Sequence, residues 1–149
     1  SRLVLKKGVK FTDAASIKGK KIGVLKGSTQ EKYAMGDLKP AGVIVNSYEA
    51  QDQVYLDIKS GRLDGTVADY MEVTGGFLSK PEGAKFELVG PDLKMPQYFG
   101  YGAGIALRKG EDQLKGELNE AIKAIRANGT YKTLNDKYFA KYNIDVYGE

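Results

Sequence analysis

The chain of 149 residues contains neither cysteine nor histidine. Without cysteine it can form no disulfide, no thiolate metal site and no cysteine nucleophile. Without histidine it lacks the usual general base of enzymes and the commonest metal ligand. No apolar run approaches the roughly 20 residues that a membrane-spanning helix needs. We therefore expect no catalytic residue, no bound metal and no cofactor.

The residues that are present have the composition of an ordinary globular domain. Hydrophobic residues make up 42% of the chain, enough for a sizeable core at this length. The net charge of +4 comes from lysines that lie in Lys/Glu-rich stretches, and the aromatic residues, chiefly tyrosines, occupy apolar-face positions. A nucleic-acid surface would instead interleave basic and aromatic residues. Solvated helix faces explain the lysines better, so we expect no nucleic-acid partner.

One stretch, residues 21–31 (KIGVLKGSTQE), organises the rest of the interpretation. The apolar run at residues 22–25 predicts a short buried strand, and Gly27 allows a sharp turn after it. Ser28 is a good helix N-cap, and it stands three residues before Glu31, the spacing of a capping box. In an open α/β sheet such a strand-to-helix turn lies at the edge where ligands bind. Ser28 either only caps the helix or also contributes to a ligand site; the pattern is not a phosphate loop.

Strands alternate with helices over the first 102 residues, which predicts a mainly parallel, doubly wound α/β sheet. We expect strands at residues 1–7, 22–25, 43–45, 66–68 and 86–89, and helices at residues 12–17, 29–36, 49–60 and 70–79. After a glycine-rich joint at residues 102–104 the pattern changes. We expect a strand at residues 105–107 and two helices at residues 111–127 and 131–142.

Several motifs of this chain resemble periplasmic amino-acid-binding proteins of bacterial ABC importers, the solute-binding proteins of family 3. Residues 18–31 (KGKKIGVLKGSTQE) are similar to the signature of the second lobe in the histidine-binding and lysine/arginine/ornithine-binding members. Further similar positions are residues 51–57, residues 61–64, Asp69, residues 98–109, residues 129–131 and residues 146–148. The resemblance covers essentially the whole chain.

The resemblance implies a fold of two α/β lobes joined by crossover strands, with the amino acid held between them. On that plan residues 1–102 form the second lobe. Residues 103–149 form a return into the first lobe, consisting of one strand and two helices. Most of the first lobe would be absent from this sequence, so we expect a fragment of the family's usual length.

The resemblance also implies the roles of five residues. An amino acid needs an anion for its ammonium group and N–H donors for its carboxylate. Asp69 matches the ammonium-binding carboxylate, Ser28 and Thr29 match the residues that meet the ligand backbone, and Leu25 and Gln30 match side-chain-pocket positions. Asp69 could instead serve only as a helix N-cap, Leu25 as core packing and Gln30 as part of a solvated helix turn.

The family's carboxylate-clamping arginine belongs to the part of the first lobe that this sequence lacks. Arg62 falls in a turn away from the expected cleft, and Arg108 is better explained as a surface charge. Neither is expected to replace the clamp.

The resemblance implies a non-catalytic protein that binds a polar or basic amino acid in the periplasm and delivers it to an ABC permease. One alternative is an enzyme on the same scaffold, similar to the cyclohexadienyl dehydratases. Dehydration needs a general acid and has no use for an ammonium-binding aspartate, so Asp69 disfavours it. A ligand-sensing receptor module is a further alternative.

The two C-terminal helices carry apolar stripes that would face the first lobe in the intact family. The stripe residues are Leu114, Leu118, Ile122, Ile125, Tyr131, Leu134, Tyr138 and Phe139. Exposed patches of this extent are rare on monomers, because burying them recovers about 25 cal/mol per Å². The helices should therefore either repack on the chain's own sheet or be covered by a second copy, and we expect a homodimer.

Overall fold

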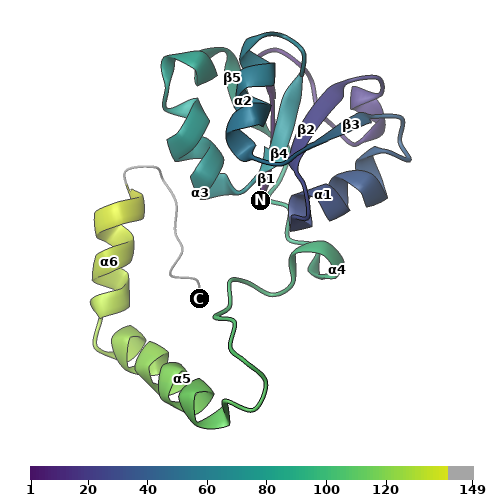
Figure 1. Ribbon diagram of the computed structural model, residues 1–149. Helices are drawn as coiled ribbons and strands as arrows, with labels where there is room; N and C mark the ends of the chain where they lie inside the picture. The colour runs from purple at the N-terminus through teal and green to yellow at the C-terminus, as the bar shows by residue number, and fades with distance from the viewer. Residues whose placement is uncertain (141–149) are drawn as a thin grey trace. The chain divides into compact units, whose positions relative to one another are not determined.

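The computed structural model describes residues 1–140 (Figure 1). The chain divides into two compact units, Ser1–Gly102 and Ala103–Glu149. This division falls at the boundary expected from the sequence, whereas the assignment of the units to two lobes stays a prediction. The similarity noted at residues 146–148 lies outside the described residues.

The first unit is built on one five-stranded sheet with the order β3-β2-β4-β1-β5. Its strands are β1 (Arg2–Lys6), β2 (Lys21–Leu25), β3 (Ile44–Tyr48), β4 (Gly65–Ala68) and β5 (Phe86–Val89). β2 is parallel to both β3 and β4, whereas β1 is antiparallel to both of its neighbours. The predicted α/β class is therefore confirmed as a mixed sheet in which β1 alone runs against the other four strands.

Both faces of the sheet are buried. Side chains alternate along β1, so Leu3 and Leu5 enter one apolar cluster while Val4 enters another. Figure 1 shows helices on both sides of the sheet. The helical segments are α1 (Thr29–Tyr33), which continues as the π-helix η2 (Ala34–Leu38), α2 (Gln51–Lys59), and α3 (Tyr70–Val73), which continues as the π-helix η3 (Thr74–Leu78).

Each cluster fixes a different set of helices. Leu3 and Leu5 pack in one cluster with residues of α1 and η2, including Tyr33 and Leu38. Val4 packs in the other cluster with residues of α2, α3 and η3. Fully burying one such aliphatic side chain contributes about 1.5–3 kcal/mol, so both helix layers are held firmly on the sheet.

Three short segments complete the first unit: η1 (Ala15–Ile17), η4 (Pro81–Lys85) and α4 (Pro96–Phe99). The sequence did not predict α4. Its rings of Tyr98 and Phe99 lie 5.7 and 5.9 Å from the ring of Tyr33, and the Tyr98 hydroxyl donates a hydrogen bond of 2.7 Å to Asp37. These long-range aromatic contacts stabilise a turn that is too short to leave a local pattern.

The second unit contains α5 (Asp112–Ala127) and α6 (Thr130–Phe139), which confirms both helices expected there. The expected end of the last helix, residue 142, lies outside the described residues. The strand expected at residues 105–107 is wrong, because these residues form no strand. A strand needs a neighbour for its backbone hydrogen bonds, and the described sheet offers this segment none.

Half of the residues in the apolar stripes of the second unit are exposed, and the other half are partly buried. In α5, Leu114 is 41% exposed and Ile122 is 37% exposed; in α6, Leu134 is 44% exposed and Tyr138 is 52% exposed. The described part of α5 contains no fully buried residue.

Candidate functional site

A small hollow lies at the carboxyl ends of the parallel strands β2 and β4. Its volume is about 100 Å³. The lining residues are Leu25, Gln30, Gln51, Val67, Ala68, Asp69 and Glu72. Parallel strands bring their carboxyl ends to one sheet edge, which is where open α/β sheets bind ligands. Three residues singled out from the sequence, Leu25, Gln30 and Asp69, therefore meet in one place.

Ser28 lies at the start of α1 and is not among the lining residues of this hollow. Its Oγ accepts a hydrogen bond of 3.0 Å from the N–H of Glu31 and donates one of 2.6 Å to the carbonyl of Leu25. The carboxylate of Glu31 accepts from the N–H of Gly27 at 2.7 Å, so the capping box is displaced by one residue from its usual form. Gly27 permits this turn through a positive φ of 74°.

The amide N–H groups at the start of α1 are the donors of the site. Among the described residues, the N–H groups of Thr29 and Gln30 have no hydrogen-bond acceptor, as is usual in the first turn of a helix. Thr29 is exposed and lies outside the lining of the hollow. The Gln30 side chain donates to the hydroxyl of Ser1 at 2.9 Å, which holds it beside the first strand.

Asp69 ends β4 and caps α3. Its Oδ1 accepts hydrogen bonds from the N–H groups of Met71 (2.9 Å) and Glu72 (3.2 Å). Its Oδ2 has no hydrogen-bond partner among residues 1–140, and the residue is exposed. The N-cap role is therefore present, and one carboxylate oxygen remains available to a ligand.

Glu72 brings a second carboxylate to the hollow. The hydroxyl of Tyr55 donates to both of its oxygens, at 2.6 and 2.7 Å. Partial burial raises the pKa of Glu72; the Tyr55 hydrogen bond lowers that pKa, and the nearby negative charges of Asp69 and Asp52 raise it further. Burial also raises the pKa of Tyr55, and the hydrogen bond to Glu72 raises it further. The phenol therefore stays protonated and acts as the donor.

Comparison with known proteins identifies the family. The model of the bacterial extracellular solute-binding proteins, family 3, matches residues 5–141. The chain belongs to this family. It is 48% identical over 149 residues to the L-arginine-binding protein of Pseudomonas aeruginosa and 41% identical over 149 residues to the histidine-binding periplasmic protein of Salmonella typhimurium. Each alignment covers 99% of this chain and 56% of the relative.

Solved structures of the family have the same fold. An ancestral arginine-binding protein bound to arginine superposes with a TM-score of 0.76 at 32% identity, covering 93% of this chain and 59% of that protein. A Salmonella typhimurium periplasmic binding protein described for its high arginine specificity gives a TM-score of 0.77 at 29% identity, with the same coverage. The chain thus spans little more than half the length of these family members.

The sequence did not predict two of the residues that line the hollow, Gln51 and Glu72. Gln51 begins α2, where its Nε2 donates to the buried hydroxyl of Thr66 at 3.4 Å. Glu72 follows Asp69 by three residues, so both lie on the same face of the first turn of α3. That spacing was the available signal for Glu72, whereas the place of Gln51 depends on how α2 packs on the sheet.

No arginine among the described residues lines the hollow of this solute-binding protein. Arg62 donates through Nε to Asp57 at 2.9 Å, and Arg2 pairs with Asp92 at 2.9 Å. Arg108 is exposed in the second unit. That neither Arg62 nor Arg108 replaces the carboxylate clamp stays a prediction.

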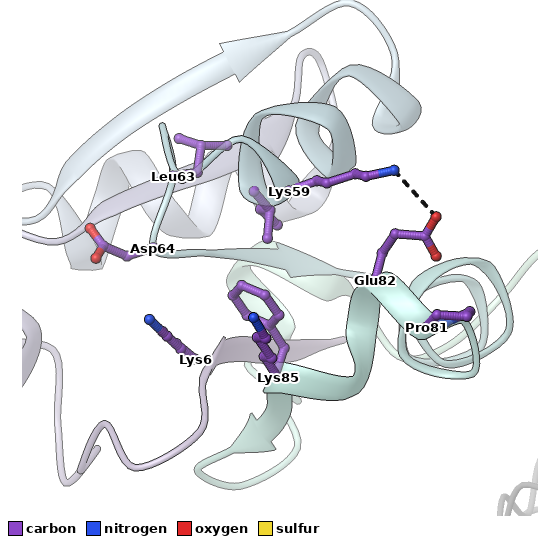
Figure 2. Close-up of a pocket in the computed structure, with 10 residues that line it drawn as sticks. Lys6, Lys59, Leu63, Asp64, Pro81, Glu82 and Lys85 are labelled. Carbon is purple, nitrogen blue, oxygen red and sulfur yellow. Dashed lines mark hydrogen bonds and ion pairs between the residues drawn. The ribbon is translucent and has the colours of Figure 1, made fainter.

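A larger hollow of about 420 Å³ lies at the opposite edge of the sheet, where β1 ends and β4 begins (Figure 2). Its lining includes the basic residues Lys6 and Lys85, together with other acidic and basic side chains that form ion pairs. Figure 2 marks the ion pair between Lys59 and Glu82, whose N–O distance is 3.5 Å. Asp64 forms an ion pair of 3.3 Å with Lys20. Despite its size, it lies away from the carboxyl strand ends and holds none of the five expected site residues.

Residues 1–140 contain neither a membrane-spanning helix nor a cluster of metal-ligating side chains. No helix in this range is both long and apolar enough to cross a bilayer. No group of three or more acidic side chains in this range is arranged to hold a metal ion.

Proposed function

We propose that this chain is the ligand-binding part of a solute-binding protein that holds a polar or basic amino acid for delivery to an ABC permease in the periplasm. One observation carries the proposal: Asp69, whose Oδ2 is uncommitted among the described residues, lines the same hollow as Leu25 and as Gln30, which lies in the first turn of α1 and has a free N–H group. A zwitterion needs an anion and N–H donors at close quarters, and this strand edge offers both.

Each residue has a separate part in the proposed complex. Asp69 binds the ammonium group, and the N–H of Thr29 donates to the carboxylate. Ser28 already gives its proton to the carbonyl of Leu25, so its Oγ would accept from the ammonium instead of donating to the carboxylate. Leu25 and Gln30 contact the ligand side chain.

The names of the relatives support an amino-acid ligand. They are described as binding arginine, histidine, or lysine, arginine and ornithine. None of these relatives is named as an enzyme, so we propose binding without turnover. No observation among the described residues favours a dehydratase or a receptor module, and the carboxylate of Asp69 in the lining of the hollow supports amino-acid binding.

We also propose that a second copy of the chain covers the exposed stripes of α5 and α6. Apolar side chains such as Leu114, Ile122 and Leu134 are 37–44% exposed, and contact with an identical surface would remove them from water.

Titration of the ¹⁵N-labelled chain with L-arginine, L-histidine and L-glutamine, followed by amide chemical shifts, tests the proposal. We expect shifts at Thr29, Gln30 and Asp69, and recovery of every ligand unchanged. Asp69→Asn should abolish the shifts while keeping the fold, because asparagine caps helices as well as aspartate does. Asp112→Asn, a matched change at the start of α5, should bind like the unmodified chain. Binding that survives Asp69→Asn would contradict the proposed site.

A further inference from the structure

Two carboxylates of the first turn of α3 border the hollow, and only one of them caps the helix. Asp69 accepts hydrogen bonds from the N–H groups of Met71 and Glu72. Among the described contacts, the carboxylate of Glu72 accepts no hydrogen bond from the helix backbone. Helix capping therefore explains the place of Asp69 but not that of Glu72, whose carboxylate is bound by the Tyr55 hydroxyl of α2 and also lines the hollow.

The carboxylate of Glu72 is held in a defined position. The Tyr55 hydroxyl binds both of its oxygens, and the Tyr55 ring stacks on Phe77 at a centroid distance of 4.8 Å and an interplanar angle of 7°. One turn further along, Gly76 leaves the necessary space, because a Cβ at that position would lie 3.2 Å from Oε1 of Glu72. The Tyr55 hydroxyl therefore positions the carboxylate, and the absence of a side chain at Gly76 leaves room for it.

The charges around Glu72 are mostly negative. Asp69 on α3 and Asp52 on α2 act on it with the same sign, and Lys80, which follows η3, is the basic residue that acts on it. No lining residue of the hollow in the described part of the chain is basic, and Gln30 and Gln51 are neutral. A cation that enters the hollow would relieve this concentration of negative charge.

We propose that Glu72 is a specificity-determining residue that supplies a second anionic contact beside Asp69 and makes the site prefer cationic over neutral amino acids. This inference rests on the proposed amino-acid site and names its ligand class. Burial and the neighbouring carboxylates raise the pKa of Glu72, so this group takes up a proton at higher pH than an ordinary glutamate does. A cationic ligand must then displace that proton, so its binding strengthens as the pH rises, whereas binding of a neutral ligand changes less.

The experiment compares L-arginine with L-glutamine, two ligands of similar length that differ in charge. Amide shifts give their Kd values at several pH values from about 4 to 8. We expect the preference for arginine to increase through a transition above the ordinary glutamate pKa of 4.5. Glu72→Gln, which keeps an oxygen for the Tyr55 hydroxyl, should remove the transition and reduce the preference about five-fold, or roughly 1 kcal/mol. Glu87→Gln, an exposed change on β5, is the matched control.

Tyr55→Phe provides a second, independent readout. It keeps the stack on Phe77 but removes the hydrogen bond that favours the charged carboxylate, so the transition should move to higher pH. A residue that only filled space would leave the pH profile in place.

The outcomes separate the two proposals. In one outcome, Glu72→Gln retains the preference and pH profile of the unmodified chain while Asp69→Asn binds neither ligand. This result would overturn the role of Glu72 and leave the proposed function intact. Asp69→Asn that binds both ligands normally would overturn the proposed site, and so would the absence of any shift with either ligand at about 100 mM.

Discussion

Ser28 and Asp69 occupy equivalent places in two neighbouring β–α units. Ser28 follows β2 and accepts the N–H of Glu31, and Asp69 follows β4 and accepts the N–H groups of Met71 and Glu72. The single oxygen of Ser28 also donates to a carbonyl, whereas Asp69 caps with one oxygen and keeps the other uncommitted. Of the two caps, Asp69 is therefore the better equipped to bind a ligand as well.

The double role of Asp69 leads to a prediction that separates stability from binding. Asp69→Ala should lower the free energy of unfolding by about 1 kcal/mol through loss of the cap, whereas Asp69→Asn should change it little. Both variants should lose ligand binding, because neither offers an anion to the ammonium group. Urea unfolding and amide-shift titration measure the two effects. A destabilised Asp69→Asn, or an Asp69→Ala that still binds, would contradict this division.

We expect the chain alone to bind amino acids no more tightly than about millimolar Kd, which corresponds to roughly 4 kcal/mol. The described hollow has no arginine for a bidentate contact with the ligand carboxylate, and its volume of about 100 Å³ encloses only part of an amino acid. Calorimetry with a competing ligand, or the titration above, gives the value. A micromolar Kd would mean that another part of the protein completes the site.

Glu31 should make the stability of the first unit depend on pH. Hydrogen bonds from Ser47 and from the N–H of Gly27, with a smaller effect of Lys26, hold its pKa below the ordinary value of 4.5. A lowered pKa in the folded state contributes stability above the unfolded-state pKa, and this contribution disappears as the pH falls through the folded-state pKa. On acidification from pH 6, the free energy of unfolding of Glu31→Gln should therefore fall less than that of the unmodified chain. The difference should equal the contribution of the Glu31 carboxylate.

Urea unfolding at a series of pH values tests this expectation. Glu117→Gln is a suitable control, because Glu117 lies in α5 with an exposed side chain that accepts only from Gln113 among the contacts described for it. Parallel acid profiles for Glu31→Gln and the unmodified chain would contradict the assignment.

The exposed stripes of α5 and α6 predict association. We expect light scattering coupled to size exclusion to give the mass of a homodimer at high protein concentration. Ile122→Glu and Leu134→Glu should shift the equilibrium to monomer, since each places a charge where apolar side chains would meet. Lys123→Gln, which lowers the net charge by the same single unit at an exposed position next to the stripe, controls for net charge. A monomer at high concentration that binds no apolar dye would show that the helices repack instead.

Local patterns were enough to predict most elements of the fold. Apolar runs and caps located β2, β5 and both C-terminal helices to within a few residues. The reversed direction of β1 and the turn of α4 depend on partners far away in the chain, so no local signal reveals them. The segment at residues 105–107 shows the converse case, since a good strand pattern forms no strand without a neighbour.

The candidate site was accessible to sequence reasoning only in part. Leu25, Gln30 and Asp69 follow from strand ends and helix starts, together with the family resemblance. The position of the Glu72 carboxylate depends on a hydrogen bond from the Tyr55 hydroxyl of α2. That contact exists only after two helices have packed on the sheet. Their roles toward a ligand remain predictions.

The antiparallel β1 has a consequence for how this unit folds. Leu3 pairs with Val67 on one side and with Val89 on the other, so this interior strand pairs only with segments that follow much later in the sequence. Such distant pairings raise the contact order, and high contact order slows folding. Until those later segments are synthesised, β1, whose buried residues belong to both cores, would stay unpaired, and an unpaired apolar strand is prone to premature association.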